Sequence, residues 1–131
     1  MVTNGNINRL FVPYELALKL KEKGFDEPCF GSYIQQVLHY KLPEKHTVLL
    51  QAPLYQQVID WLFNKNIFID LGLDETNGVI TFYIMLIKIE LFKPFKKQPA
   101  KLGTGVKYEQ FDIPTKEEAL NKAIEEALKL I

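Results

Sequence analysis

The sequence has a single cysteine among its 131 residues, Cys29, which excludes an internal disulfide. Small secreted domains often depend on disulfides, so the cysteine content gives no indication of an oxidising compartment. The first nine residues also lack the apolar stretch of a secretory signal peptide. We therefore expect an intracellular, cytoplasmic protein.

A long apolar run and an excess of charge of either sign are also missing. The longest apolar stretch, Val79 to Ile87, is interrupted only by Thr81 and is far shorter than the roughly 18 to 20 residues of a membrane helix. Sixteen Lys and Arg balance sixteen Asp and Glu, so no overall field attracts nucleic acid or an anionic membrane. With 47% hydrophobic residues, the composition predicts one globular domain over 1–131 that does not contact a membrane.

Three segments have the apolar spacing of amphipathic helices, and we predict helices over 13–24, 53–65 and 115–131. Pro13 suits a first helical position because its missing N–H would have no partner there. Gly24 followed by Phe25 is typical of a helix C-terminus. Thr115 with Glu118 matches a capping box at the start of the third helix.

Strand-forming residues fill much of the remaining chain, and together with the helices they predict an α+β fold with a mostly antiparallel sheet of about four or five strands. The predicted strands are 29–42, 47–51, 67–73, 79–92 and 106–111. For 29–42 helical spacing competes with strand-forming residue types, so helix stays open beside the favoured strand. A loop over 74–78, containing Asn77-Gly78, predicts a hairpin.

The predicted strand 79–92 has two further features. Its apolar first half predicts a central strand that is covered on both faces. Its fourteen residues exceed the usual strand length, so a bend or bulge is expected within it.

Two segments are predicted to lie outside the packed core. Residues 1–9 are polar and turn-prone and predict a flexible N-terminal arm. Residues 93–105 contain two Pro, two Gly and four Lys, which predicts a long lysine-rich surface loop.

The nucleophilic and metal-ligating residues are few and scattered. Cys29 could act as a nucleophile if His39 or His46 approached it, but free cysteine is among the most buried residue types and a core position is favoured. The two histidines have no partner at a zinc-like interval, so no metal and no cofactor are predicted. Gly103-Thr104-Gly105 resembles a phosphate loop only superficially, because no Gly-Lys-Ser/Thr enters a helix.

Two groups of residues are candidates for binding. The first could contact nucleic-acid phosphates, with Phe95 and Tyr108 nearby to stack on bases: Lys93, Lys96, Lys97, Lys101 and Lys107. An exposed lysine-rich loop is more often simply solvated, and the zero net charge argues the same way. The second could line a groove for a peptide or small ligand near the helix starts: Tyr14, Tyr55, Gln56, Gln57 and Trp61. Packed tyrosine rings whose hydroxyls reach water are the favoured alternative.

Four segments, 11–15, 24–30, 52–62 and 118–128, resemble a family of short uncharacterised proteins from gut bacteria and their phages. These segments include Phe11-Val-Pro-Tyr-Glu15 and Gly24-Phe-Asp-Glu-Pro-Cys-Phe30. The resemblance implies strand character after Cys29 and a phage or mobile-element context. That family has no assigned activity, so the resemblance transfers no functional residue.

The sequence therefore favours a noncatalytic protein-interaction module, a monomer or weak homodimer whose partner is another protein. A nucleic-acid-binding accessory protein that uses the lysine-rich loop is the alternative. A small enzyme that uses Cys29 is the least favoured interpretation.

Overall fold

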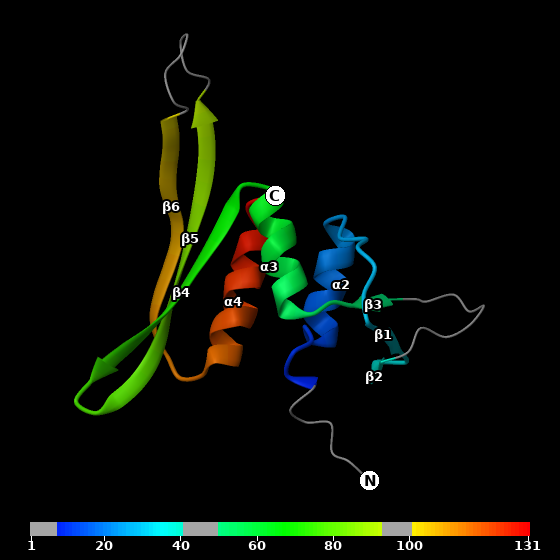
Figure 1. Cartoon of the computed structure of the whole chain (residues 1–131). Helices are drawn as coiled ribbons and strands as arrows, with labels where there is room; N and C mark the ends of the chain where they lie inside the picture. The colour runs from blue at the N-terminus through cyan, green and yellow to red at the C-terminus, as the bar shows by residue number, and fades with distance from the viewer. Residues whose placement is uncertain (1–7, 41–49, 93–100) are drawn as a thin grey trace.

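A computed structural model describes residues 8–40, 50–92 and 101–131 (Figure 1). In these ranges it has three helices and six strands in the order α2 (Tyr14–Glu22), β1 (Gly31–Ile34), β2 (Val37–His39), β3 (Leu50–Ala52), α3 (Tyr55–Asn64), β4 (Ile67–Thr76), β5 (Val79–Phe92), β6 (Lys101–Ile113) and α4 (Lys116–Leu128). The predicted α+β class and the three predicted helices are confirmed. Residues 1–7 of the predicted arm lie outside the described residues.

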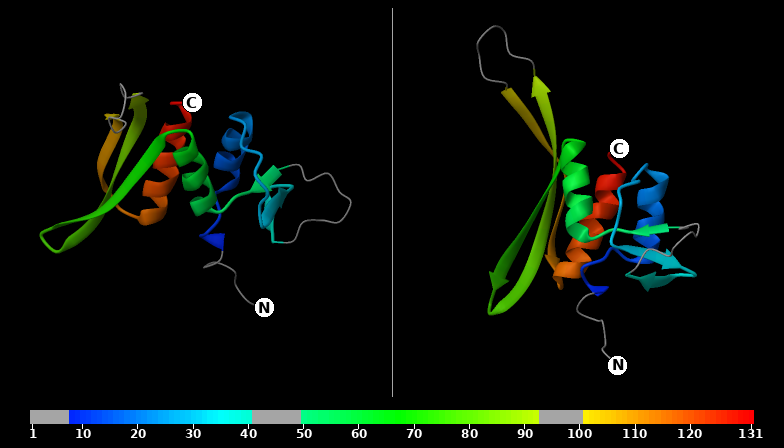
Figure 2. Two further views of the ribbon diagram at one scale, coloured as in Figure 1. Left: turned by 45° about the horizontal axis from the view of Figure 1, so that its top comes forward. Right: turned by 45° about the vertical axis from the view of Figure 1, so that its right-hand side comes forward.

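The described strands form two antiparallel sheets of three strands, not one sheet of four or five. The smaller sheet has the order β2-β1-β3, and the larger has the order β4-β5-β6. The helices lie between the two sheets (Figures 1 and 2). Helices α3 and α4 cover one face of the larger sheet, while α2 packs against α4 and β3. One hydrophobic core joins residues from all three helices and both sheets.

Helix α2 ends in the way that Gly24-Phe25 predicts. Gly24 has a φ of +94°, and its N–H donates to the Lys21 carbonyl at 3.1 Å. The Phe25 N–H donates to the Leu20 carbonyl at 3.0 Å, which completes a Schellman motif. This turn directs Phe25 into the core, where its ring meets Trp61 edge-on at 5.3 Å.

A hydrogen bond between a side chain and a backbone N–H three residues apart stabilises the start of α3 and of α4. The Leu54 N–H donates to Gln57 Oε1 at 3.0 Å. At α4, Thr115 Oγ1 accepts a hydrogen bond from the Glu118 N–H at 3.1 Å, as the predicted cap requires. These bonds satisfy backbone donors that a helix start leaves without partners.

Residues 29–42, for which the sequence was compatible with strand or helix, contain a β-hairpin. Strands β1 and β2 pair around Gln35 and Gln36, whose φ angles are +50° and +66°. Two consecutive residues with positive φ suit the twist of a two-residue hairpin. Of the predicted strand 47–51, the described part belongs to β3, and 47–49 lie outside the described residues.

The larger sheet begins with a tighter hairpin than predicted. Strand β4 continues to Thr76, so only Asn77 and Gly78 form the turn, and the predicted loop over 74–78 is wrong for 74–76. Both turn residues have positive φ, +53° and +78°. Because the turn has only two residues, Thr76 pairs directly with Val79, and 74–76 therefore continue the pairing of β4 with β5.

The predicted lysine-rich loop over 93–105 is wrong for its last five residues, which belong to strand β6. The strand begins at Lys101 and ends at Ile113, so 101–105 are paired with β5 and the predicted edge strand 106–111 is too short. Residues 93–100 lie outside the described residues. The expected irregularity in β5 is present as two register shifts against β6, at Phe82/Ile84 and at Leu86/Ile87. Beyond the helices, β5 and β6 continue as a two-stranded ribbon (Figure 1).

Strand β5 is central, but its apolar first half is not covered on both faces. Ile84 and Leu86 are fully buried beneath the helices. Val79 and Ile80 are 59% and 61% exposed, because this end of the hairpin extends past α3 and α4 (Figure 2). No described helix or strand lies over the opposite face of the sheet in Figures 1 and 2, although the Phe63 ring at the end of α3 meets Phe68 edge-on at the β4 edge.

Candidate functional site

A cavity of about 790 Å³ lies where α3 and α4 begin. Its apolar lining comes from the N-terminal segment, α3, β4 and α4, through Leu10, Leu54, Tyr55, Ile59, Leu71 and Leu120. Its polar lining is Arg9, Gln56, Thr115, Lys116 and Glu117. The cavity therefore has an apolar floor and a charged rim.

Tyr55 fixes one wall of this cavity. Its ring is buried, and its hydroxyl donates to Asn121 Oδ1 on α4. Burial, and secondarily the charge of Glu117, raises the pKa of the Tyr55 hydroxyl above its usual range. The phenol therefore stays protonated and remains a hydrogen-bond donor that joins α3 to α4.

The structure separates the five residues of the predicted groove. Tyr55 and Gln56 line the cavity. Gln57 instead donates from Nε2 to the Pro28 carbonyl at 2.9 Å, and Trp61 packs on Phe25. The Tyr14 ring meets Tyr33 edge-on at 5.5 Å, away from this cavity.

The lysine group is only partly described. Lys101 and Lys107 belong to β6, and Lys107 is exposed. Lys93, Lys96 and Lys97 lie outside the described residues. The described pair therefore lies on strand β6 and not in a loop: Lys101 in the two-stranded ribbon, and Lys107 where β4 also pairs.

The environment of Cys29 does not favour a nucleophile. The thiol is buried and donates to the Glu27 carbonyl at 3.2 Å. Burial, together with the negative charge of Glu27, raises the pKa of the Cys29 thiol from 9.0 to about 11. His39 is exposed on β2, and His46 lies outside the described residues. At neutral pH the thiol is therefore protonated.

The uncovered face of the larger sheet, which we call the outer face, is a second candidate surface. Alternate residues of a strand point to opposite sides, so the register assigns each position to a face. Ile67, Ile69, Ile84 and Leu86 point toward the helices and are buried. The outer face consequently holds Phe68, Tyr83, Met85, Ile87, Val106 and Phe111, none of which was a candidate from the sequence.

These outer-face residues form rows across the strands. Phe68, Ile87 and Val106 are cross-strand partners and make one apolar row. Tyr83 lies opposite Gly72 and stacks on Phe111 with ring centroids 5.9 Å apart, which makes an aromatic row. Phe68, Val106 and Phe111 are 39%, 55% and 48% exposed.

An acidic row separates the two apolar rows. Met85 pairs with Asp70 on one side and with Glu109 on the other. The positions that the described register assigns to this face include no lysine or arginine. The outer face is therefore both apolar and negatively charged. The sequence held one signal of this face, because Phe68 and Asp70 alternate with the buried Ile67 and Ile69. The same run of residues also fits a strand that is covered on both faces.

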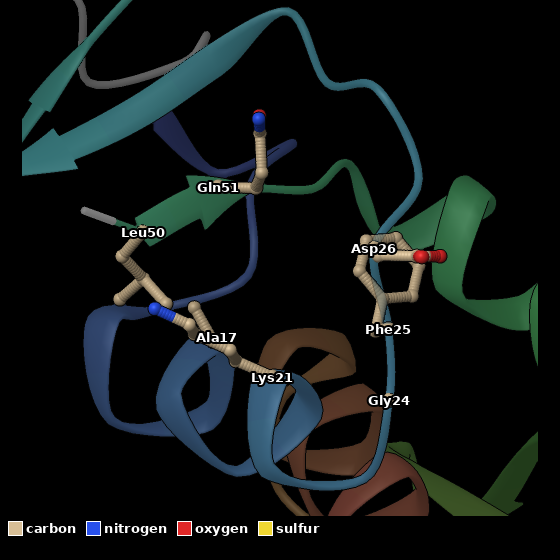
Figure 3. A pocket seen from close by; sticks show the side chains of 7 residues that line it. All are labelled: Ala17, Lys21, Gly24, Phe25, Asp26, Leu50 and Gln51. Atoms are coloured by element: carbon tan, nitrogen blue, oxygen red, sulfur yellow. The ribbon is translucent and has the colours of Figure 1, made fainter. Parts of the chain in front are cut away.

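A smaller cavity of about 340 Å³ lies between the C-terminal half of α2 and β3 (Figure 3). Ala17 and Lys21 line it from α2, Phe25 and Asp26 from the following segment, and Leu50 and Gln51 from β3. Its charged groups are one lysine and one aspartate, so it shows no preference for a ligand of either sign.

No family model, curated protein or solved structure matches the chain. What the chain binds is therefore inferred from its own surfaces. Across 8–40, 50–92 and 101–131, no three His, Cys, Asp or Glu side chains gather in a way that could hold a metal ion. The described helices include none that is long and apolar enough to span a bilayer.

Proposed function

We propose that the protein is a noncatalytic interaction module that binds another protein through the outer face of its larger sheet. The observation that supports this most is the apolar row of Phe68, Ile87 and Val106, of which Phe68 and Val106 are exposed. An antiparallel sheet with one packed face usually shows polar residues on the other. Apolar side chains gathered on an exposed surface are typical of a binding site.

The acidic row defines the chemistry of the partner. Asp70 and Glu109 flank Met85, so a complementary surface carries Lys or Arg between two apolar groups. A second copy of the chain fits poorly, because face-to-face pairing would bring like charges together. We therefore favour a monomer that binds a different protein. The resemblance to proteins of gut bacteria and their phages supports a phage or mobile-element context for that partner.

Affinity capture with matched variants tests this proposal. Wild-type protein, Val106→Glu/Phe111→Glu and the control Phe30→Glu are each used as bait in lysate from cells that produce the chain. Phe30 is 71% exposed and lies outside the larger sheet, before β1. A partner that binds the wild type and the Phe30 variant but not the double variant supports the proposal. Equal capture by all three baits contradicts it.

Nucleic-acid binding by the β5–β6 ribbon is a second candidate function. The ribbon projects beyond the helices and begins at Lys101, and Lys107 follows on the same strand where β4 joins the sheet (Figure 1). Two-stranded ribbons can enter a nucleic-acid groove. If this function holds, single-stranded or duplex nucleic acid binds at low salt and binding weakens as salt rises. Lys101→Glu/Lys107→Glu would then abolish it. No binding by the wild type at low salt would remove this candidate.

A further inference from the structure

The cavity between the starts of α3 and α4 has the size and the lining of a small-molecule site. Ligand pockets usually have volumes of roughly 300 to 1,000 Å³ and walls that are mostly apolar. The 790 Å³ cavity is lined by four aliphatic side chains of the folded core and its edge, from Leu54, Ile59, Leu71 and Leu120. An apolar chain could therefore lie along this floor.

The rim of the cavity favours a negative charge. Arg9 approaches from the N-terminal segment and Lys116 from the first turn of α4. Neither cation forms an ion pair with a described residue, as the ion pairs involve Lys19, Lys122 and Lys129. Glu117 is the one carboxylate in the lining, so two cations face one anion.

The uncharged polar side chains that line the cavity form hydrogen bonds within the protein. Gln56 donates from Nε2 to Asp60 Oδ1 at 2.9 Å along α3, and Thr115 caps α4. The Tyr55 hydroxyl is used by Asn121. Arg9, Lys116 and Glu117 have no ion pair with a described residue, so the rim keeps one positive charge in excess. An anionic group in hydrogen-bond reach of a guanidinium gains a charge-assisted bond.

We propose that this cavity binds a small amphipathic anion, with an apolar tail on the leucine and isoleucine floor and a carboxylate at Arg9 and Lys116. The site shares no residue with the outer face, so a test of this site does not depend on the proposed protein partner. A medium-chain fatty acid has both required parts.

Calorimetric titration with three probes that share a ten-carbon chain tests the proposal: decanoate, decanol and decyltrimethylammonium. The two ionic probes are kept below their micelle concentrations and decanol below its solubility limit. Decanoate is expected to bind saturably and at least about tenfold more tightly than either other probe, because only its head group is paired by the two cations. Arg9→Gln/Lys116→Gln should weaken decanoate binding by about tenfold and leave decanol unchanged. The control Lys23→Gln, at the exposed residue that follows α2, should change neither.

Both changed residues are exposed, so the double variant keeps the wild-type unfolding temperature and its binding can be compared directly. Equal affinity for all three probes, or unchanged decanoate binding in the double variant, would overturn the charge preference. The absence of saturable decanoate binding to the wild type would overturn the site itself.

Discussion

The ring of Tyr83 lies directly over Gly72, its cross-strand partner in β4. A Cβ added to Gly72 would stand 2.2 Å from Tyr83 Cζ, so the aromatic ring occupies the space that any other residue at 72 would need. Tyr83 in turn stacks on Phe111. The aromatic row of the outer face therefore depends on a glycine in the neighbouring strand.

Gly72→Ala is expected to displace the Tyr83 ring and disrupt its stacking on Phe111, because backbone and ring cannot both stay in place. We expect a loss of about 1 kcal/mol in the free energy of unfolding, typical of mild overpacking. The near-ultraviolet circular dichroism should change as well. Gly105→Ala is the matched control, since its Cβ would approach only the flexible Lys107 side chain, at 3.4 Å. Equal effects of the two variants would show that Tyr83 does not depend on Gly72.

Gly24→Ala should destabilise the protein through backbone conformation alone. The residue has a φ of +94°, and nothing lies within 4 Å of an added Cβ. A loss of about 1 kcal/mol is therefore expected from the left-handed conformation. Gly24→Asn should lose less, because asparagine adopts positive φ more readily. Urea unfolding followed by Trp61 fluorescence measures both, and an unaffected Ala variant would contradict the assigned Schellman motif.

The ends of the elements were predictable because their causes are local. Gly24 with Phe25, and Thr115 with Glu118, act within one turn of chain. The division into two sheets depends on pairing between distant strands, such as β1 with β3, which no local pattern specifies. The β1–β2 turn was missed because glutamine is not a usual residue at positive φ.

The candidate surfaces were harder to predict for related reasons. Gln56 and Gln57 are neighbours in sequence, but a helix turns by about 100° per residue, so they point to different parts of the molecule. The outer face joins Phe68, Ile87 and Val106, which only the strand register brings together. Residue types alone therefore made candidates of Tyr55 and Gln56, which line the cavity, but not of the row on the outer face.

Tyr33→Phe should remove a buried hydrogen bond. The Tyr33 hydroxyl donates to the Val12 carbonyl at 2.6 Å, and the variant would leave this buried acceptor without its partner. A loss of about 1 to 3 kcal/mol in the free energy of unfolding is expected. Tyr14→Phe is the control, because its hydroxyl has no hydrogen bond to any described residue while its ring packs on the same tyrosine. A similar loss in both variants would show that the hydrogen bond to Val12 is not the cause.

Cys29 should make stability fall in alkali. The pKa of its thiol rises from 9.0 to about 11 in the folded state, so between these values the unfolded chain releases a proton that the folded chain keeps. The stabilisation is fully present below pH 9 and is lost as the pH rises to 11. Cys29→Ala should flatten this part of the profile of unfolding free energy against pH. An unchanged slope would place the thiol in contact with water.

The reactivity of the same thiol gives an independent check. Iodoacetamide should label Cys29 slowly at pH 7 and much faster in denaturant, because the thiolate fraction is small and the side chain is buried. Rapid labelling of the folded protein would instead support a nucleophilic Cys29.

Photo-crosslinking from the outer face tests the central claim most directly. A photoreactive benzoyl-phenylalanine replaces Phe111 in one variant and Phe30 in the other, and both are irradiated in lysate of cells that produce the chain. We predict a discrete adduct from position 111 that is absent from position 30 and disappears when Asp70→Lys and Glu109→Lys reverse the charge of the acidic row. Identical adducts from both positions, or an adduct at 111 that survives the charge reversal, would contradict binding of a basic, apolar partner at this face.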